Sequence, residues 1–353
     1  MEQEPLLDVR DLRLSVNTHR GEASILDGVS FTLREGKVTC LVGESGCGKS
    51  VTSLTVMGLQ QPLASGKSPL RASGEIRFQG ENLLTLTDAQ MEAKRGNQIA
   101  MVFQEPMTSL NPVLTIGEQL AEAVRTHRPQ LTQQEVEAKV LSTLEKVNIS
   151  GQGRLNEYPF QLSGGMRQRI MIAMALINDP KLLIADEPTT ALDVTVQAQI
   201  LKLMKNLQEE HQASILFITH DLGVVAEIAD DVIVMYGGRV VESGPVEEVF
   251  RDPQHPYLIG LLNSIPRIGE RRDTLQTIRG MVPPVTAMPS GCRFRTRCPF
   301  AAEKCAELPP AVTHHDTHVS HCWFTPLEQY FSQPTDHTQR NEADLDKEPC
   351  HAN

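Results

Sequence analysis

The sequence lacks any hydrophobic run of the about 18 residues that a membrane-spanning helix needs. Its first residues, Met1 to Pro5, are acidic and contain no hydrophobic signal-peptide core. Basic residues are in deficit, with 33 Lys and Arg against 44 Asp and Glu and a formal net charge of −11. General nucleic-acid binders need positive charge to displace counterions from phosphates. These absences predict a cytoplasmic protein that is not a general nucleic-acid binder.

The sequence also has no C-x-x-C pair, the spacing that is typical of zinc ribbons. Its seven cysteines are unevenly placed, with Cys40 and Cys47 early in the chain and Cys350 in the polar tail. Four others crowd into a late segment, with five, six and sixteen residues between them: Cys292, Cys298, Cys305 and Cys322. In a cytoplasmic protein such a cluster indicates a metal site rather than disulfides.

The identity of that metal stays open at this point. Four thiolates suit either a [4Fe–4S] cluster or zinc, and the wide spacing favours the cluster, whose ligands surround a cube. Four neighbouring histidines also allow a mixed zinc site: His314, His315, His318 and His321. Free thiols are the third alternative. We expect the bound metal to stabilise the fold of a segment that has little hydrophobic core of its own.

One stretch has the composition of a phosphate-binding loop, G-x-x-x-x-G-K-[ST]. It consists of Gly43, Glu44, Ser45, Gly46, Cys47, Gly48, Lys49 and Ser50. Residues 37–42 before it are typical of a buried strand, and residues 51–59 after it have helical spacing. Glycines permit positive φ, so successive N–H groups can surround phosphate oxygens. We predict Lys49 on the β- and γ-phosphates and Ser50 on Mg²⁺.

Three later apolar runs, residues 99–103, 182–185 and 214–219, are predicted to be buried strands. The polar residues that follow them are Gln104, Asp186, Glu187 and His220. Because ligands bind at the carboxyl ends of strands in α/β sheets, we expect these four side chains to face one ligand. Asp186 suits a water-mediated hold on Mg²⁺, and Glu187 can polarise a water that attacks the γ-phosphate.

The remaining segments predict supporting layers around this α/β core. The 353 residues, 40% of them hydrophobic, suffice for one large domain or two modest ones. Residues 6–42 alternate apolar and polar side chains, as antiparallel strands do. Residues 115–147 have helical spacing and form a helical insertion, and residues 232–242 indicate a closing hairpin. Ser163, followed by two glycines, marks a helix start, which is either a second anion site or an ordinary helix cap.

In this order the motifs resemble the nucleotide-binding subunits of ABC transporters over residues 6–250. Residues 43–50 resemble the Walker A loop, and Gln104 resembles the Q-loop glutamine. Residues 162–166 resemble the signature motif, and residues 182–187 resemble the Walker B motif. Residues 191–193 resemble the D-loop, and His220 resembles the switch histidine. The resemblance implies an ABC-type P-loop NTPase fold with an antiparallel β subdomain and a helical subdomain. It also implies that ATP and Mg²⁺ are bound, with Mg²⁺ at Ser50, Gln104 and Asp186, and that Gln104 and His220 sense the γ-phosphate.

The resemblance further implies a head-to-tail pair of ATPase subunits. Each ATP then lies between one Walker A loop and the signature serine of the other subunit, so Ser163, Gly165 and Asp193 complete a nucleotide site. The partner is a paralogue or a second copy. In one respect this chain differs from the family pattern, because Val16, with His19 nearby, stands where an aromatic residue usually stacks on adenine.

Two segments narrow the resemblance to the dipeptide and oligopeptide importers. Residues 103–112 are similar to the Q-loop of those ATPases, and 255–257 with the cysteine segment are similar to their C-terminal extension, which carries a [4Fe–4S] cluster in some members. Nickel and glutathione importers share this layout. A soluble ABC ATPase is a further alternative, although such proteins usually have two cassettes or a long coiled coil.

The resulting expectation is an ATPase that energises peptide import. It divides the chain into a nucleotide-binding domain (1–250, helical subdomain about 105–165), a small metal-binding extension (251–325) and a disordered tail (326–353). The implied partners are a second ATPase subunit, two transmembrane permease subunits and a periplasmic or extracellular solute-binding protein. The implied location is the cytoplasmic face of the cell (inner) membrane, as a peripheral protein.

Overall fold

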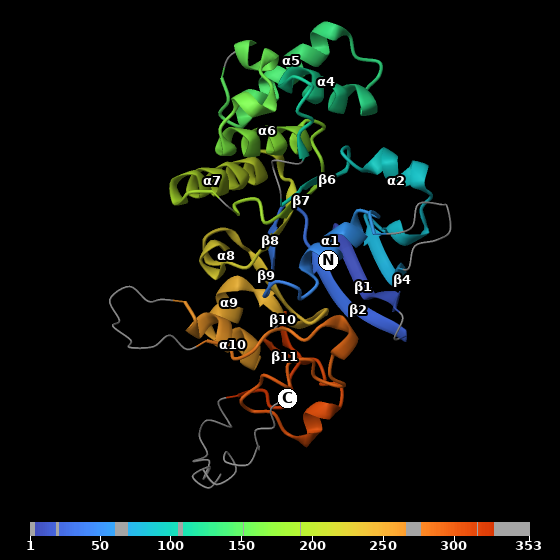
Figure 1. Ribbon diagram of the computed structural model, residues 1–353, viewed down its shortest axis with the longest axis vertical. Helices are drawn as coiled ribbons and strands as arrows, with labels where there is room; N and C mark the ends of the chain where they lie inside the picture. Colours follow the sequence, from blue (N-terminus) through green and yellow to red (C-terminus); the bar gives the residue numbers. More distant parts are fainter. Residues whose placement is uncertain are drawn as a thin grey trace, which may run out of the picture.

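The computed structural model (Figure 1) describes residues 4–18, 21–60, 70–104, 109–150, 152–190, 192–265, 277–315 and 317–327. Several predictions concern residues outside these ranges. They are the adenine neighbour His19, the Q-loop residues 105–108, Ala191 of the D-loop, Cys350 and the tail from residue 328. Among the described residues, no helix is both long and apolar enough to cross a membrane.

An eight-stranded sheet in the order β11-β12-β10-β9-β3-β8-β7-β6 forms the centre of the molecule. Its strands are β3 (Val38–Val42), β6 (Ile99–Val102), β7 (Leu182–Asp186), β8 (Ser214–Thr219), β9 (Asp231–Tyr236), β10 (Arg239–Pro245), β11 (Val312–His315) and β12 (His318–Ser320). The strands from β6 to β9 are parallel, and β10 to β12 continue antiparallel. Every residue of β3, β7 and β8 is buried, as expected for parallel strands covered on both faces.

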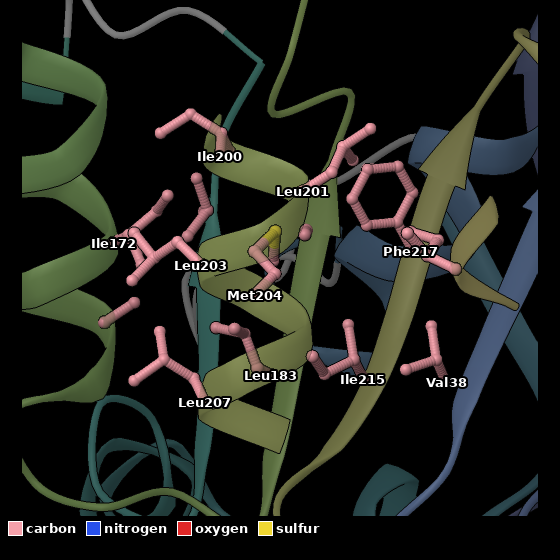
Figure 2. Packing of buried hydrophobic residues seen from close by; sticks show 14 of the residues in the cluster. Val38, Ile172, Leu183, Ile200, Leu201, Leu203, Met204, Leu207, Ile215 and Phe217 are labelled. Atoms are coloured by element: carbon pink, nitrogen blue, oxygen red, sulfur yellow. The ribbon is translucent and has the colours of Figure 1, made fainter. Parts of the chain in front are cut away.

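Helices cover both faces of this sheet. They are α1 (Lys49–Val56), α6 (Gly164–Leu176), α7 (Val194–His211), α8 (Leu222–Ile228), α9 (Val246–Arg251) and α10 (Pro256–Asn263). Figure 2 shows α7 between α6 and the strands, with Leu203 facing Ile172 and Met204 near Leu183. All four of these side chains are at most 3% exposed. The apolar residues of α7 are therefore spaced so that they pack against α6 on one side and against the sheet on the other.

A second, antiparallel sheet in the order β2-β1-β4-β5 lies beside the predicted phosphate loop, residues 43–50, where Leu26 of β2 is close to Gly48. Its strands are β1 (Leu7–Thr18), β2 (Gly21–Leu33), β4 (Leu70–Phe78) and β5 (Glu81–Asn82). The sequence suggests two short runs, 7–10 and 12–16, where the structure has the single strand β1. The register shifts between Val9 and Leu12, and Asp11 takes a positive φ of 44°. Such a bulge interrupts the alternation without ending the strand.

The helical lobe occupies the top of Figure 1, where α4 (Ile116–His127) and α5 (Gln133–Lys146) lie over α6. Each helix begins with a capping box, Thr115 with Glu118 and Thr132 with Glu135, which divides the predicted helical region in two. A further helix, α2 (Asp88–Lys94), lies nearer the antiparallel sheet. Short 3-10 turns complete the described chain: Leu83–Thr85, Gln152–Asn156, Pro159–Gln161, Val285–Ala287 and Glu303–Ala306.

The segment after residue 250 packs on the same sheet as the cassette. β12 pairs antiparallel with β10, matching Ser320 with Glu242. Tyr257 and Phe294 are 0% and 2% exposed and belong to the main hydrophobic core. The extension thus adds two strands and large aromatic side chains to the cassette core.

Candidate active site

The phosphate loop connects β3 to α1, as the sequence predicts. Gly43, Gly46 and Gly48 all have positive φ, at 153°, 80° and 104°. At Gly43 an added Cβ would lie 2.3 Å from the carbonyl oxygen of Met235, so a larger residue cannot fit there. Lys49 is 5% exposed, and its Nζ donates to the carbonyl oxygens of Gly43 at 2.7 Å and Glu44 at 3.2 Å. The loop therefore holds an ammonium group over its own backbone.

Three polar side chains converge on the carboxylate of Glu187. Gln104 Nε2 donates to Oε2 at 3.1 Å, and the hydroxyl of Thr190 donates to the same oxygen at 2.9 Å. His220 Nδ1 lies 3.2 Å from Oε1. Gln104 and His220 follow β6 and β8, and Glu187 follows β7 between them. The order of the strands brings together side chains that are far apart in the sequence.

The protonation of Glu187 reflects two opposing effects. Partial burial raises the pKa of its carboxyl group, but hydrogen bonds from His220 and Thr190 and the charge of Lys49 lower it. The net result is a pKa below the ordinary value, so the group is a carboxylate at neutral pH. A carboxylate that is ionised and directed by neighbours can accept a proton from water.

Asp186 links Walker B to the phosphate loop. Its Oδ1 accepts a hydrogen bond of 3.1 Å from the hydroxyl of Ser50 at the start of α1. Burial raises the pKa of Asp186, and the charge of Glu187 raises it further, while the bond from Ser50 lowers it. The Asp186 carboxylate and the Ser50 hydroxyl, together with the amide of Gln104 that contacts the adjacent Glu187, offer the kind of oxygen ligands that Mg²⁺ prefers. The residues present therefore fit a Mg²⁺ ion that accompanies nucleotide phosphates.

The other three predicted nucleotide contacts lie on α6 and α7. Ser163 caps α6 by accepting a 3.3 Å hydrogen bond from the amide of Met166. Asp193 caps α7 through the amide of Val196 at 3.0 Å. A Cβ added to Gly165 would lie 2.8 Å from Val196 Cγ1, so the two helix starts are in close contact. Figure 1 shows α6 well away from α1, so this group is separate from the phosphate loop of the same chain.

Three residues that contact the site are missing from the sequence-based candidates. Thr190 was not distinguished because a threonine after a Pro188-containing turn carries no motif of its own. The hydroxyl of Tyr257 accepts a hydrogen bond of 2.7 Å from the amide of Glu44. Arg297 forms an ion pair of 2.6 Å with the Glu44 carboxylate. Its position between Cys292 and Cys298 carries no local signal of a contact with the phosphate loop.

The four late cysteines line one small cavity together with His255, Phe294 and Trp323. Burial raises the pKa of the Cys298 thiol to about 12 and that of Cys322 to about 11, and it also raises that of Cys292. Within the ranges that the structure describes, no three Cys, His, Asp or Glu side chains form a group that could hold a metal ion as they stand. The expected metal-binding extension is therefore not supported by the positions of these side chains, although they face one space.

The adenine position predicted from the sequence lies on β1. Val16 is half-buried there and pairs with Ala23 of β2 and Leu70 of β4. Valine has no aromatic ring, so it cannot stack on a base as Phe, Tyr or Trp can.

Comparisons with known proteins place these motifs in a family context. Residues 26–190 match the family described as ABC transporter, and residues 241–305 match the one described as oligopeptide/dipeptide transporter, C-terminal region. A protein of Brucella ovis named as a peptide import ATP-binding protein is 50% identical over 91% of this chain and 98% of its own length. The dipeptide transport ATP-binding protein DppD of Bacillus subtilis is 48% identical over 91% of this chain and 95% of its own.

Solved structures agree with these relatives on the fold. A dimeric, post-hydrolysis state of the ATP-binding cassette MJ0796 bound to ADP and Pi matches with a TM-score of 0.60 and 27% identity. The match covers 68% of this chain and 98% of that cassette. The cbiO1 protein of Clostridium perfringens, part of the transporter complex cbiONQ, matches with a TM-score of 0.59 and 28% identity over 71% of this chain and 92% of its own.

Proposed function

This chain belongs to the ATP-binding subunits of ABC transporters, and from that premise we propose that it hydrolyses ATP to drive the import of dipeptides or oligopeptides. The peptide cargo is supported by the names of its relatives and by the match of residues 241–305 to the C-terminal region of peptide transporters. The hydrolysis is supported by one observation above all. The Glu187 carboxylate is fixed by Gln104, Thr190 and His220 at the sheet edge where the phosphate loop begins.

Each side chain of the site has a proposed task. Backbone N–H groups of residues 43–50 bind the phosphates, and Lys49 moves from its two carbonyl partners to the β- and γ-phosphates. Ser50, Asp186 and Gln104 would hold Mg²⁺, which when bound would neutralise phosphate charge. Glu187 accepts the proton of the attacking water. Gln104 and His220, which both contact Glu187, orient it toward the γ-phosphate.

The replacement Glu187→Gln tests this assignment. It keeps the size of the side chain and removes the proton acceptor, so we expect at least about a hundredfold loss of ATP turnover with ATP binding retained. Lys49→Ala, in contrast, should abolish binding itself. Full turnover by the Glu187→Gln variant would contradict the role of this residue as the base.

The cargo requires a separate experiment in cells. Cells that lack this chain should lose uptake of a labelled dipeptide, and the wild-type chain but not Glu187→Gln should restore it. Loss of nickel or glutathione uptake with unchanged dipeptide uptake would contradict the peptide assignment and favour the other cargoes of the same subfamily.

The second group of nucleotide contacts is proposed to serve a partner subunit. Ser163, Gly165 and Asp193 lie on α6 and α7, away from the phosphate loop of their own chain. A head-to-tail dimer brings them to the γ-phosphate of the other subunit's ATP. In a preparation with Glu187→Gln, which keeps ATP bound, size-exclusion chromatography should show a dimer with MgATP. Ser163→Arg should prevent that dimer, and a persistent dimer would contradict this placement.

An apolar groove is the proposed contact for a membrane permease, which would place the chain on the cytoplasmic face of the cell membrane. The groove has a volume of about 480 Å³, and Met57, Leu59, Phe103 and Met174 are among its lining residues. Phe103 and Leu59 are 40% and 43% exposed and line the same groove, so their exposed apolar surface is contiguous. Phe103 directly precedes Gln104, so contact at the groove reaches the site. Phe103→Arg should release the chain from membranes that contain the permease, whereas unchanged membrane association would contradict the proposal.

A [4Fe–4S] cluster at Cys292, Cys298, Cys305 and Cys322 is also proposed, with zinc as the alternative. Its support is that all four thiols line one cavity, in a segment that wraps them with Phe294 and Trp323. Protein purified without oxygen should contain about four irons per chain and show a broad absorption band at about 400 nm. One zinc without colour would favour the zinc alternative, and absence of both metals would contradict a metal site.

A further inference from the structure

We propose that Arg297 and Tyr257 of the C-terminal extension position the phosphate loop for nucleotide binding by fixing Glu44. Neither residue belongs to a nucleotide-binding motif, and both follow the cassette in the sequence. The inference rests on the nucleotide site proposed above. The experiment below distinguishes failure of that site from failure of this inference.

Glu44, the second residue of the phosphate loop, is held at three points. Its carboxylate accepts two hydrogen bonds from the guanidinium of Arg297, at 2.6 Å and 3.1 Å. Its amide donates to the hydroxyl of Tyr257 at 2.7 Å. Its carbonyl oxygen accepts the 3.2 Å hydrogen bond from Lys49 Nζ. A single loop residue therefore connects the extension to the lysine that reaches the phosphates.

Arg297 is itself immobilised. Its side chain is 6% exposed, and its Nε and Nη2 donate to the carbonyl oxygens of Arg279 at 2.9 Å and Gly280 at 3.0 Å. The guanidinium carbon lies 5.6 Å from the ring centre of Tyr236 and 6.0 Å from that of Phe294, within the range of cation–π attraction. Because Arg297 has this many partners, its guanidinium group faces Glu44 in a single orientation.

Tyr257 is equally constrained. It is 0% exposed, and its ring packs at 4.8 Å from Tyr236 and 5.3 Å from Phe294, measured between ring centres. The hydroxyl is therefore placed by buried aromatic packing and not by a mobile loop. Both anchors of Glu44 belong to the same cluster, which joins the end of β9 to α10 and to the turn that carries Cys292 and Cys298.

Two physical effects make this arrangement favour nucleotide binding. A loop whose first residues are already ordered loses less conformational entropy when it closes on phosphates. In addition, an unpaired Glu44 carboxylate beside the phosphate site would repel the nucleotide, and pairing with Arg297 cancels that charge. Both effects act on binding. The side chains assigned to hydrolysis follow β6, β7 and β8, and Gln104 and His220 contact Glu187 rather than Glu44, so we expect the chemical step to be little changed.

The test compares ATP affinity and turnover in the full-length chain. Arg297→Gln should weaken ATP binding by about tenfold, measured as the Kd for MgATP, and raise KM similarly. The kcat at saturating ATP should stay within about twofold of wild type, because only binding is affected. Tyr257→Phe, which keeps the ring and removes the hydroxyl, should weaken binding by about threefold. Arg295→Gln is the matched control, since Arg295 lies in the same turn and donates to Ser290 instead.

A double-mutant cycle tests whether Arg297 acts through Glu44. The variant with both Glu44→Gln and Arg297→Gln should bind ATP no more than about twofold more weakly than Arg297→Gln alone. If Arg297 had a purely structural role, Arg297→Gln would lower the Tm. The Kd for MgATP, measured at a temperature well below that Tm, would then be unchanged. Additive losses in the cycle, or wild-type affinity in both Arg297→Gln and Tyr257→Phe, would overturn the inference. If Lys49→Ala also bound ATP normally, the nucleotide site itself would be misplaced.

Discussion

Glu187 has a backbone conformation that side chains of L-residues rarely adopt. Its φ is +47°, and its amide donates to the carbonyl oxygen of Ile218 at 3.0 Å in the neighbouring strand. A left-handed conformation costs a non-glycine residue about 1–2 kcal/mol. The surrounding hydrogen bonds maintain this strain, which turns the carboxylate toward Gln104 and His220. Strain of this kind is common where geometry is needed for chemistry.

Removal of the Glu187 side chain should reveal this strain. Glu187→Gly and Glu187→Ala both delete the carboxylate and its three contacts, but only glycine adopts positive φ without cost. We expect Glu187→Gly to have a free energy of unfolding about 1 kcal/mol higher than Glu187→Ala, measured by urea denaturation. Both variants should be inactive. Equal stability of the two would show that the backbone is not strained at this position.

Asp27 on β2 joins three parts of the chain through arginines. Its carboxylate contacts Arg13 of β1 at 2.6 Å, Arg239 of β10 at 2.5 Å and Arg293 of the extension at 2.9 Å. Burial raises the pKa of Asp27, but the hydrogen bond and charge of Arg239 and the charges of Arg293 and Arg13 outweigh it. The net pKa is lower than usual. The folded state therefore favours the ionised carboxylate.

Asp27→Asn should destabilise the protein at neutral pH by about 2–3 kcal/mol, since it leaves buried Arg293 without its counter-ion. Because the folded pKa is depressed, the contribution of Asp27 is fully present above the ordinary pKa and is lost as pH falls toward the folded value. Urea denaturation at several pH values should thus show the difference shrinking below about pH 4. Asp11→Asn, at an exposed aspartate that pairs with Arg13, is the control and should cost under about 0.5 kcal/mol.

At the scale of an element, the turn between β9 and β10 depends on the backbone conformation of one residue, Gly238. Gly238 has a φ of +77°, its amide donates to Cys47 of the phosphate loop at 2.7 Å, and its carbonyl accepts from Asp27. An added Cβ would lie 1.9 Å from the carbonyl oxygen of Ile25. The hairpin thus touches both the antiparallel sheet and the nucleotide loop through one glycine.

Gly238→Ala should therefore cost more than the backbone penalty alone. Gly80→Ala provides the comparison, because Gly80 has a similar φ of +82° and an added Cβ would have no atom of the described residues within 4 Å. We expect a loss of about 1 kcal/mol at Gly80 and at least about 3 kcal/mol at Gly238, where the clash is with backbone. Thermal unfolding of both variants measures the difference. Similar losses would mean that the turn relaxes away from Ile25.

At this scale the sequence predicts strands and helices well where the pattern is local. The phosphate loop, the apolar strands β6, β7 and β8 and the polar residues that end them all follow from short runs of side chains. β1 is different, because the bulge at Asp11 breaks the alternation while hydrogen bonding continues. Contacts such as Thr190 with Glu187 or Arg297 with Glu44 depend on which strands lie side by side. No local pattern encodes that order.

For the whole molecule, the main consequence is that the cassette and the extension share one sheet and one core. Removal of all residues after Arg251 would leave β10 with an unpaired edge and uncover Tyr236, which is 0% exposed in the full chain. Exposed strand edges promote aggregation. We expect this truncated chain to be insoluble, as judged by ultracentrifugation of cell lysates.

Truncation after Leu327 is the matched comparison. It removes residues 328–353, nearly all of the tail that the sequence predicts to be disordered, and keeps β11 and β12. That shorter chain should stay soluble with an unchanged Tm. A soluble, cooperatively unfolding chain that ends at Arg251 would show instead that the cassette does not need the extension.

The pairing of β12 with β10 also determines when this edge of the sheet can be completed during translation. β10 ends at Pro245 and β12 begins at His318, so about 70 residues must be translated between them, which takes roughly 4–15 s. During that interval the nascent cassette has an edge with unpaired backbone groups and an aromatic cluster without Phe294. Ribosome-associated chaperones therefore have a defined period in which to bind this edge, and it ends only when the cysteine segment has emerged.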